Sequence, residues 1–317
     1  MSKFNKLPAP IHDLHRQLLE VGACGDGPLT LFHPRVRDRA DIEVLRCNDS
    51  GVIVLSRIDH IIDSFYTDPL PVSSLTGLDN AIDYQDRLDT SRRIKLLNRS
   101  VANRRWLDIG TGPGTLITEL EGVPTLSCGV EPNNVYRSML QSNSHDIRPS
   151  IEDFHGCYFD VISLFHVFEH LVDPLDHLNR VRELLIPGGN IFIEIPHANE
   201  FLLNCANLVE YRDFTLWSQH LVLHTQRSIV QMLQYSGFNI INLEGIQRYS
   251  LENHLYWFKY GLPGGHHVMS DLVEDDLRLS YEETLRRLDS TDTLMVSATV
   301  PTDNVLLTVS ELMWMCC

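Results

Sequence analysis

The chain has 317 residues, of which 43% are apolar and 21% charged, the balance of an ordinary globular protein. Its net charge of −16, from 26 basic and 42 acidic residues, disfavours a nucleic-acid partner. The seven cysteines are scattered without a disulfide framework, the N-terminus lacks the apolar core of a signal peptide, and no apolar run is long enough to span a membrane. These features predict a cytoplasmic protein.

The first 80 residues are expected to form a small N-terminal module followed by a linker. Short strands at 42–45 and 51–55 flank a turn at 48–51, and the Pro-, Ser- and Gly-rich residues 71–80 are typical of a linker. A helix at 81–103 should follow. Its dense basic stretch indicates a solvated helix face and consists of Arg92, Arg93, Lys95, Arg99, Arg104 and Arg105.

From residue 106 onward, short apolar segments alternate with helical patterns, which is typical of a parallel sheet covered on both faces. The expected strands are 106–109, 126–130, 160–165, 190–195, 239–245 and 293–299. The expected helices are 115–121, 133–142, a segment after 165 that ends at 185, and 228–236. Residues 81–317 therefore form the main domain, in which long insertions at 197–226 and 248–291 should shape a substrate pocket.

A glycine-rich loop at 110–114 follows the first of these strands and opens a helix. Glycine lets the backbone turn tightly and approach a ligand closely. A dinucleotide site uses G-x-G-x-x-G with pyrophosphate at the helix N-terminus, whereas this loop reads G-x-G-x-G with Asp108 two residues before the first glycine. An acid at that position suits a ligand that carries an amine and a sulfonium, and it disfavours a dehydrogenase. Glu131 ends the next strand, where an open α/β sheet binds ribose hydroxyls.

Four segments in this order resemble the class I S-adenosylmethionine-dependent methyltransferases. They are WLDIGTGPG at 106–114, GVEPN at 129–133, YFDVISLFHVFEHLVDP at 158–174 and LLIPGGNIFIEIP at 184–196. The resemblance implies a doubly wound, mostly parallel seven-stranded sheet and S-adenosylmethionine as the cofactor. It also implies a set of cofactor-binding residues, namely Asp108, Gly110, Thr111, Gly112 and Gly114 for the methionine part, Glu131 for the ribose, Glu152 or Asp153 for adenine, and Phe165 beside the methionine end.

Within that family the layout looks like bacterial enzymes that methylate nucleotide sugars or related glycan precursors. Those enzymes often carry an N-terminal zinc module with two Cys-x-x-Cys-Gly pairs. Here Cys24 and Cys47 are present, but Val21 and Ser50 occupy the positions of the other two thiolates. Two thiolates cannot complete a Cys₄ zinc site. We therefore expect a degenerate module without metal.

Methyl transfer requires in-line alignment of nucleophile, methyl carbon and sulfur, and a base when the acceptor is a hydroxyl or a carbon acid. His166 and His170 are four residues apart after the strand at 160–165, so on a helix they would share one face. We expect His170, with Glu169 beside it, or else His166, to act as the base, and we expect no metal site. The histidines of the two insertions, including His220, are individually more typical of surface or structural positions.

The main functional prediction is methyl transfer from S-adenosylmethionine to a small polar acceptor, such as a sugar, nucleotide sugar or glycan precursor, in carbohydrate modification. The alternatives are an acceptor of quinone, lipid or polyketide type, and a non-catalytic cofactor-binding protein. The aromatic and histidine residues of the second insertion are compatible with a polar-aromatic pocket or with plain helix packing. The acceptor atom and the oligomeric state stay open, because this fold supports carbon, oxygen and nitrogen methylation alike.

Overall fold

The computed structural model describes residues 10–62, 65–67 and 79–302, with the side chains of 79–85 excepted. Most of the expected linker therefore lies outside the described residues. Two sheets organise the described chain: a seven-stranded sheet in the order β10-β11-β8-β7-β4-β5-β6 and a four-stranded sheet in the order β1-β2-β3-β9. Within the described ranges, no helix is both long enough and apolar enough to cross a bilayer.

The large sheet is parallel except at one edge, as expected. Its strands are β4 (Arg105–Ile109), β5 (Leu126–Val130), β6 (Asp146–Arg148), β7 (Phe159–Phe165), β8 (Leu185–Pro196), β10 (Asn239–Ile246) and β11 (Thr293–Thr299). Strands β6, β5, β4, β7 and β8 pair in parallel, while β11 is antiparallel to both β8 and β10. This confirms the predicted doubly wound, mostly parallel seven-stranded sheet.

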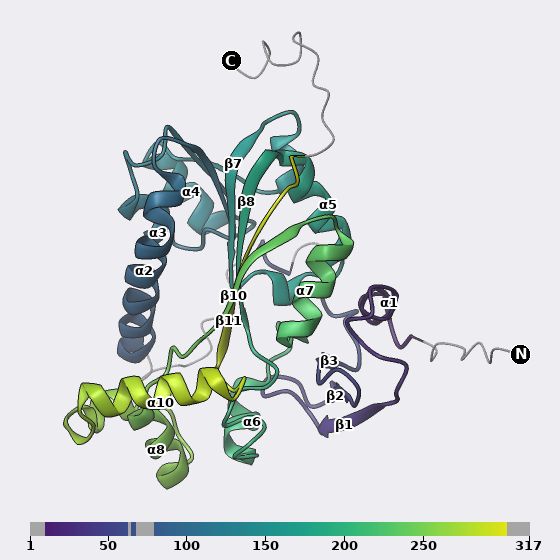
Figure 1. Ribbon diagram of the computed structural model, residues 1–317, viewed down its shortest axis with the longest axis vertical. Coiled ribbons are helices and arrows are strands. Elements are labelled where there is room, and N and C mark those ends of the chain that lie inside the picture. The colour runs from purple at the N-terminus through teal and green to yellow at the C-terminus, as the bar shows by residue number, and fades with distance from the viewer. Residues whose placement is uncertain (1–9, 63–64, 68–78, 303–317) are drawn as a thin grey trace, which may run out of the picture.

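Helices cover both faces of this sheet, as Figure 1 shows. On one face lie α2 (Asp79–Val101), α3 (Thr115–Glu119) and α4 (Asn134–Ser142), and on the other lie α5 (Pro174–Leu184) and α7 (Gln226–Tyr235). Each face has its own apolar core. The face under α2 and α3 is centred on Trp106, and the α5–α7 face continues without interruption into the N-terminal residues.

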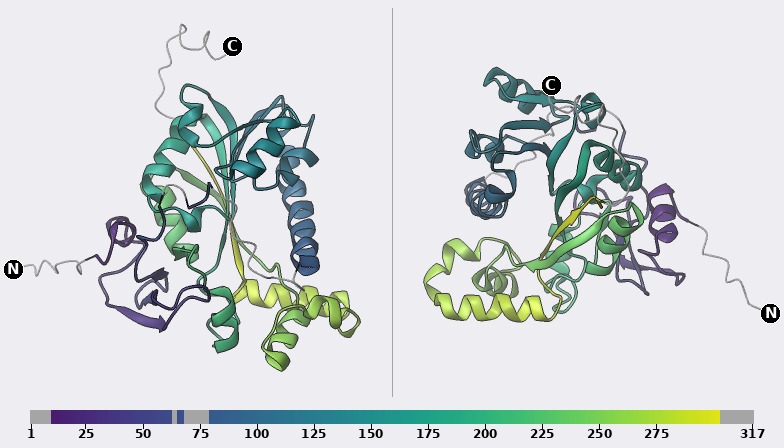
Figure 2. Two further views of the ribbon diagram at one scale, coloured as in Figure 1. Left: turned by 180° about the vertical axis from the view of Figure 1, so that it is seen from behind. Right: turned by 45° about the horizontal axis from the view of Figure 1, so that its top comes forward.

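The N-terminal residues form α1 (Asp13–Glu20), β1 (Leu29–His33), β2 (Val44–Cys47) and β3 (Ile53–Leu55). The fourth strand of their sheet, β9 (Val222–Leu223), comes from the first insertion and is antiparallel to β3. That insertion also contains α6 (Val209–Thr215). The two views of Figure 2 place this small sheet and the second insertion on different sides of the molecule.

The second insertion is mainly helical. It contains α8 (Leu251–Tyr260), the short α9 (Gly265–Val268), a 3₁₀ turn η3 (Ser270–Leu272) and α10 (Asp275–Arg287). Further 3₁₀ turns, η1 (Ile151–Phe154) and η2 (Phe168–His170), flank β7. The insertion helices pack beyond the end of β10 and β11, near one end of α2 (Figure 1).

Candidate active site

The glycine loop between β4 and α3 has three glycines with positive φ: 76° at Gly110, 54° at Gly112 and 78° at Gly114. A Cβ at Gly110 would lie 2.3 Å from a Val167 methyl group, and one at Gly114 would lie 2.2 Å from a Leu140 methyl group. A Cβ at Gly112 would meet nothing within 4 Å. Gly110 and Gly114 therefore allow close packing of the protein, whereas Gly112 borders open space that a ligand can fill.

Asp108 is buried at the C-terminal end of β4. Its Oδ1 accepts a 2.6 Å hydrogen bond from the Ser163 hydroxyl, which in turn accepts one of 2.8 Å from the Trp106 indole. Burial raises the pKa of the Asp108 carboxyl to about 7. The carboxyl borders a cavity of about 170 Å³ together with Thr111 and Phe165. Because it can ionise near neutral pH, it can respond to a cationic group placed in this cavity.

The same cavity contains a polar atom without a hydrogen bond. Thr111 is buried, and its hydroxyl has no partner among the described residues. Phe165, the last residue of β7, also lines this cavity, and the Arg93 guanidinium lies 4.9 Å from its ring centroid. An orphaned hydroxyl, an open glycine and a titratable acid fit the methionine part of S-adenosylmethionine, which carries a carboxylate, an ammonium and a sulfonium.

Glu131 directly follows β5 and borders a larger cavity of about 430 Å³. Its two carboxylate oxygens accept hydrogen bonds from the backbone N–H groups of Gly112, at 2.7 Å, and Asn133, at 2.8 Å. Burial raises the pKa of Glu131. Glu152 lines the same cavity, whereas Asp153 is turned away and accepts a hydrogen bond from the Ser150 N–H. Of the two residues expected near adenine, the geometry therefore favours Glu152.

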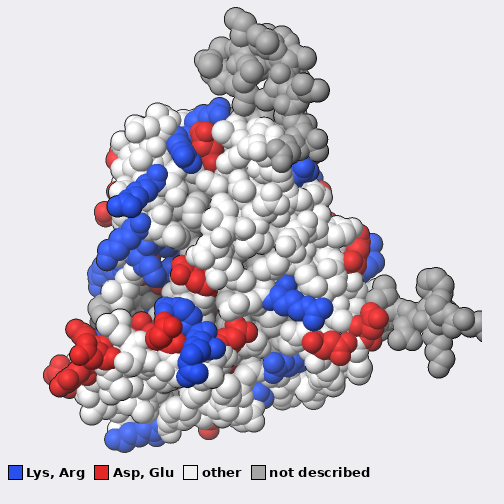
Figure 3. All heavy atoms as spheres, viewed as in Figure 1, with Lys and Arg blue, Asp and Glu red and all other residues white. Residues whose placement is uncertain are grey.

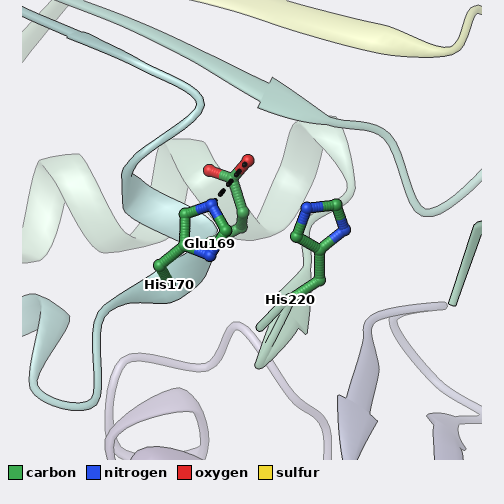
Figure 4. A group of neighbouring side chains, drawn as sticks. All are labelled: Glu169, His170 and His220. Carbon is green, nitrogen blue, oxygen red and sulfur yellow. Dashed lines mark ion pairs between the residues drawn. The ribbon is translucent and has the colours of Figure 1, made fainter. Parts of the chain in front are cut away.

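His166 and His170 both reach this cavity, but not from a continuous helix. His166 has a positive φ of 54°, and His170 ends the short 3₁₀ turn η2. The expectation that both lie on one face of a helix is wrong. They converge instead on the fully buried carboxylate of Glu169, as Figure 4 shows for His170.

The two histidines differ in their surroundings. His166 lies with Nδ1 3.3 Å from Glu169 and Nε2 3.3 Å from Glu194. Burial opposes the charged form of His166, and Arg248 also disfavours it, but the two carboxylates prevail and raise its pKa. An imidazolium held between two carboxylates is a poor proton acceptor at neutral pH.

His170 is oriented for a different role. Its Nδ1 lies 2.7 Å from the carbonyl oxygen of Gln219, which requires a proton on Nδ1, and its Nε2 lies 3.8 Å from Glu169. Burial would raise the pKa of Glu169, but the nearby His170, His166 and His220 outweigh it and hold that pKa at about 2. Glu169 therefore stays ionised and stabilises positive charge on the imidazole of His170.

His220, which the sequence suggested to be a surface or structural histidine, lies beside His170. It follows Gln219 in the first insertion, and its ring centroid lies 5.2 Å from that of His170. Burial, with His170 adding to it, lowers the pKa of His220 to about 3, so its ring is uncharged. The candidate ligand atoms of Glu169, His170 and His220 lie within 4.8 Å of one another. Three ligand atoms at this spacing could hold a metal ion, with Glu169 and the two imidazoles as its ligands.

An ion-pair network supports the cluster from α2. The Glu194 carboxylate, buried at the end of β8, accepts hydrogen bonds from Arg92 at 2.7 and 3.0 Å and from Arg93 at 2.6 and 3.2 Å. Burial would raise the pKa of Glu194, but His166 and these two arginines outweigh it and hold that pKa well below its usual range. Asp89 in turn bonds both Arg92 and Arg248. The expectation of a solvated basic face is therefore wrong for Arg92 and Arg93, which neutralise a buried acid.

Cys24 and Cys47 lie together in the N-terminal module. Both thiols are buried, and the Cys47 sulfur accepts a 3.4 Å hydrogen bond from the Gly25 N–H. Burial, with Cys47 nearby, raises the pKa of Cys24. In this setting the two cysteines pack as small apolar core residues.

Comparison with known proteins places the chain in a family. Residues 83–243, half of the chain, match the family described as "Methyltransferase domain". The ubiquinone biosynthesis O-methyltransferase of Cereibacter sphaeroides is 34% identical over 94 residues, which cover 27% of this chain and 38% of that one. The enzyme of the same name from Actinobacillus pleuropneumoniae is 31% identical over 103 residues, which cover 28% and 44%. The chain thus spans less than half the length of these two relatives.

Solved structures show partial likeness. A SAM-dependent methyltransferase from Archaeoglobus fulgidus has a TM-score of 0.48 at 19% identity, covering 67% of this chain and 93% of that one. The N-methyltransferase NodS from Bradyrhizobium japonicum, in complex with S-adenosyl-L-homocysteine, has a TM-score of 0.42 at 11% identity, covering 68% and 88%. The chain belongs to the methyltransferase-domain family, as a class I protein whose cofactor is S-adenosylmethionine.

Proposed function

We propose that this protein transfers the methyl group of S-adenosylmethionine to a hydroxyl oxygen of a small acceptor, with His170 as the general base. The observation that carries the proposal is the orientation of His170. Its Nδ1–H donates a hydrogen bond to the Gln219 carbonyl. The Nε2 atom therefore carries a lone pair, which can accept a proton beside the cofactor cavity. A base is needed for a hydroxyl acceptor but not for an amine that is already neutral.

The cofactor residues follow from the two cavities that meet at the glycine loop. Asp108 and Thr111 would bind the amino-acid end of the cofactor, with Phe165 as the apolar wall. Glu131 would accept hydrogen bonds from the ribose hydroxyls, and Glu152 would lie at the adenine end. When bound, S-adenosylmethionine supplies an electrophilic methyl group on a good leaving group. The protein then has to align the acceptor oxygen and remove its proton.

Glu169 supports this proton transfer. As the acceptor oxygen forms its bond to the methyl carbon, its proton passes to Nε2 of His170, and the resulting imidazolium is stabilised by the ionised carboxylate 3.8 Å away. The carbonyl of Gln219 keeps the ring in the tautomer that leaves Nε2 free. His166 has a positioning role in this scheme, because its imidazole lies 3.3 Å from both Glu169 and Glu194 and offsets the repulsion between the two carboxylates.

The names of the curated relatives favour a phenolic hydroxyl of quinone type over the sugar hydroxyl expected from the sequence. The matched segments cover under a third of this chain, so these names bear less on the acceptor side of the site. We therefore propose an O-methyltransferase and test two classes of acceptor. The first class is the dihydroxybenzoates, and the second is the sugar nucleotides.

The experiment measures methyl transfer from labelled S-adenosylmethionine to both classes. With the acceptor that turns over, His170→Gln should lower turnover by about 10²–10⁴-fold and leave S-adenosylhomocysteine affinity nearly unchanged. The same substitution at the exposed His155 is the matched control and should keep wild-type turnover. Wild-type turnover by folded His170→Gln would refute the base assignment. Cofactor binding without transfer to either class would favour a non-catalytic cofactor-binding protein.

A further inference from the structure

A third cavity, of about 370 Å³, lies between α2 and the second insertion. Its walls come from α2, from the segment after β10 and from the helices of the insertion, and include Leu88, Asp89, Arg92, Arg248, Glu252 and Arg278. Sites for small molecules typically measure about 300–1,000 Å³. Figure 3 shows acidic and basic side chains interleaved over this part of the molecule, near α10 and the adjoining end of α2.

The charges that line this cavity balance. Three acids, Asp89, Glu252 and Glu282, face three bases, Arg92, Arg248 and Arg278. Asp89 bonds Arg92 at 3.0 Å and also bonds Arg248, and Glu252 bonds Arg278. A balanced, internally paired lining attracts neither a phosphate nor a metal cation strongly. It suits an uncharged polar group that hydrogen-bonds to the outer edges of these pairs.

Two polar atoms of this lining have unsatisfied hydrogen-bonding capacity. Glu252 is only 1% exposed, and neither its Oε2 nor the buried hydroxyl of Ser250 makes a hydrogen bond of good geometry among the described residues, although the two side chains are close enough for Ser250 to lower the pKa of Glu252. A buried carboxylate oxygen without a donor is costly, by about 1–3 kcal/mol or more for a charged group. Both residues lie at the N-terminal end of α8 and border the cavity, so hydroxyl groups of a ligand can satisfy both of them.

The cavity is close to the proposed reaction site. Arg92 lines it and binds Glu194, which in turn lies 3.3 Å from His166 in the wall of the cofactor cavity. On α2, Asp89 and Arg92 face this cavity, while the adjacent Thr90 and Arg93 face the cavity beside Asp108. An acceptor that extends past the partly exposed side chain of Arg92 would place one part in each space.

We propose that this cavity, here called the α2–α8 subsite, binds an uncharged polyhydroxylated part of the methyl acceptor through Glu252, Ser250 and the paired arginines. The inference rests on the proposed function, because it assigns the subsite to the acceptor. It adds a requirement that the comparisons do not contain. The acceptor carries hydroxyl groups besides the oxygen that is methylated.

The test uses saturation-transfer difference NMR on protein loaded with S-adenosylhomocysteine, with myo-inositol and D-glucose as polyol probes and 3,4-dihydroxybenzoate as an aromatic probe. Leu88→Trp fills the subsite from an exposed position of α2 without breaking an ion pair, and Leu277→Trp, at an exposed position of α10 outside the subsite, is its matched control. Wild type and Leu277→Trp should saturate at least one polyol, and Leu88→Trp should lower that signal by about tenfold, because the ring occupies the cavity.

A second pair of variants tests the chemistry of the subsite. Glu252→Gln keeps the shape but replaces an acceptor oxygen by a donor, so polyol binding should weaken several-fold, whereas Glu283→Gln on the exposed side of α10 should not change it. Absence of polyol saturation in wild type, or equal saturation in Leu88→Trp, would overturn the proposal. Saturation of the aromatic probe alone, lost in Leu88→Trp, would assign the subsite to a different ligand class. None of these readouts requires turnover, so they are independent of the outcome for His170.

Discussion

The affinity for S-adenosylhomocysteine should rise with pH through neutrality, because Asp108 titrates there. Burial raises the pKa of this carboxyl to about 7 in the free protein. The amino group of the ligand is cationic at this pH, so the ligand should bind when the Asp108 carboxyl is ionised and not when it is protonated. An acid with a raised pKa holds its proton below that pKa, so at lower pH binding must first displace the proton, and affinity increases as the pH rises.

The expected magnitude follows from this pKa. If only the ionised form binds, the apparent affinity scales with the ionised fraction, which is about a tenth at pH 6 and about nine tenths at pH 8. The dissociation constant should therefore fall about tenfold between these two pH values, equivalent to about 1.4 kcal/mol. Binding at pH 6 should also release close to one proton, which isothermal titration calorimetry detects in buffers of different ionisation enthalpy.

The decisive variant is Asp108→Asn, which keeps the size of the side chain and cannot ionise. It should bind the ligand weakly, with no rise in affinity from pH 6 to pH 8. Glu152→Gln removes a carboxylate from the far end of the larger cavity and should retain the tenfold slope. A wild-type affinity that changes less than twofold over this range, or an unchanged slope in Asp108→Asn, would show that Asp108 is not the group that meets the ligand's amine.

Three further outcomes are expected. Bound S-adenosylhomocysteine should raise the melting temperature of the wild type by mass action, and Gly112→Val should abolish this rise because its side chain enters the open space beside the loop. Gly114→Ala should lower the melting temperature of the free protein, because its Cβ would lie 2.2 Å from a leucine methyl group. Glu194→Gln should lower the free energy of unfolding by about 3–5 kcal/mol in urea titrations, since it removes the buried charge shared by two arginines. Metal analysis should find less than one zinc per chain at Cys24 and Cys47, and a chelator should leave the melting temperature unchanged.

The central sheet was predictable because its signals are local. Strand β4 is a short apolar run that ends at a glycine loop, and the structure places it at Arg105–Ile109 against an expected 106–109. The buried role of Arg92 and Arg93 was less visible, since a helix that neutralises a buried acid has the same composition as a solvated one. The available signal was Glu194, an acid inside the apolar strand β8, which requires a buried partner.

The features that the sequence did not predict correctly depend on contacts between segments that are far apart in the chain. The helical expectation at 166–170 failed because carboxylates from two elements fix His166 on both sides, and this arrangement overrides the local i, i+4 spacing. Strand β9 has only two residues and no periodicity, so its pairing with β3 has no local signature. The position of His220 beside His170 depends on that pairing, because the two rings come together only when the first insertion folds back onto the N-terminal sheet.

The N-terminal module has a structural connection to the proposed chemistry that does not require zinc. Its strand β3 ends at Leu55, whose N–H donates to the carbonyl of Leu221, and the N–H of Leu221 donates to the carbonyl of Glu169. The segment that carries Gln219 is thereby fixed between the module on one side and the turn η2, which carries Glu169 and His170, on the other. Because the Gln219 carbonyl sets the tautomer of His170, displacement of β3 should disturb the proposed base without touching the cofactor. The apolar core, which continues from the large sheet into the N-terminal residues, supports this connection.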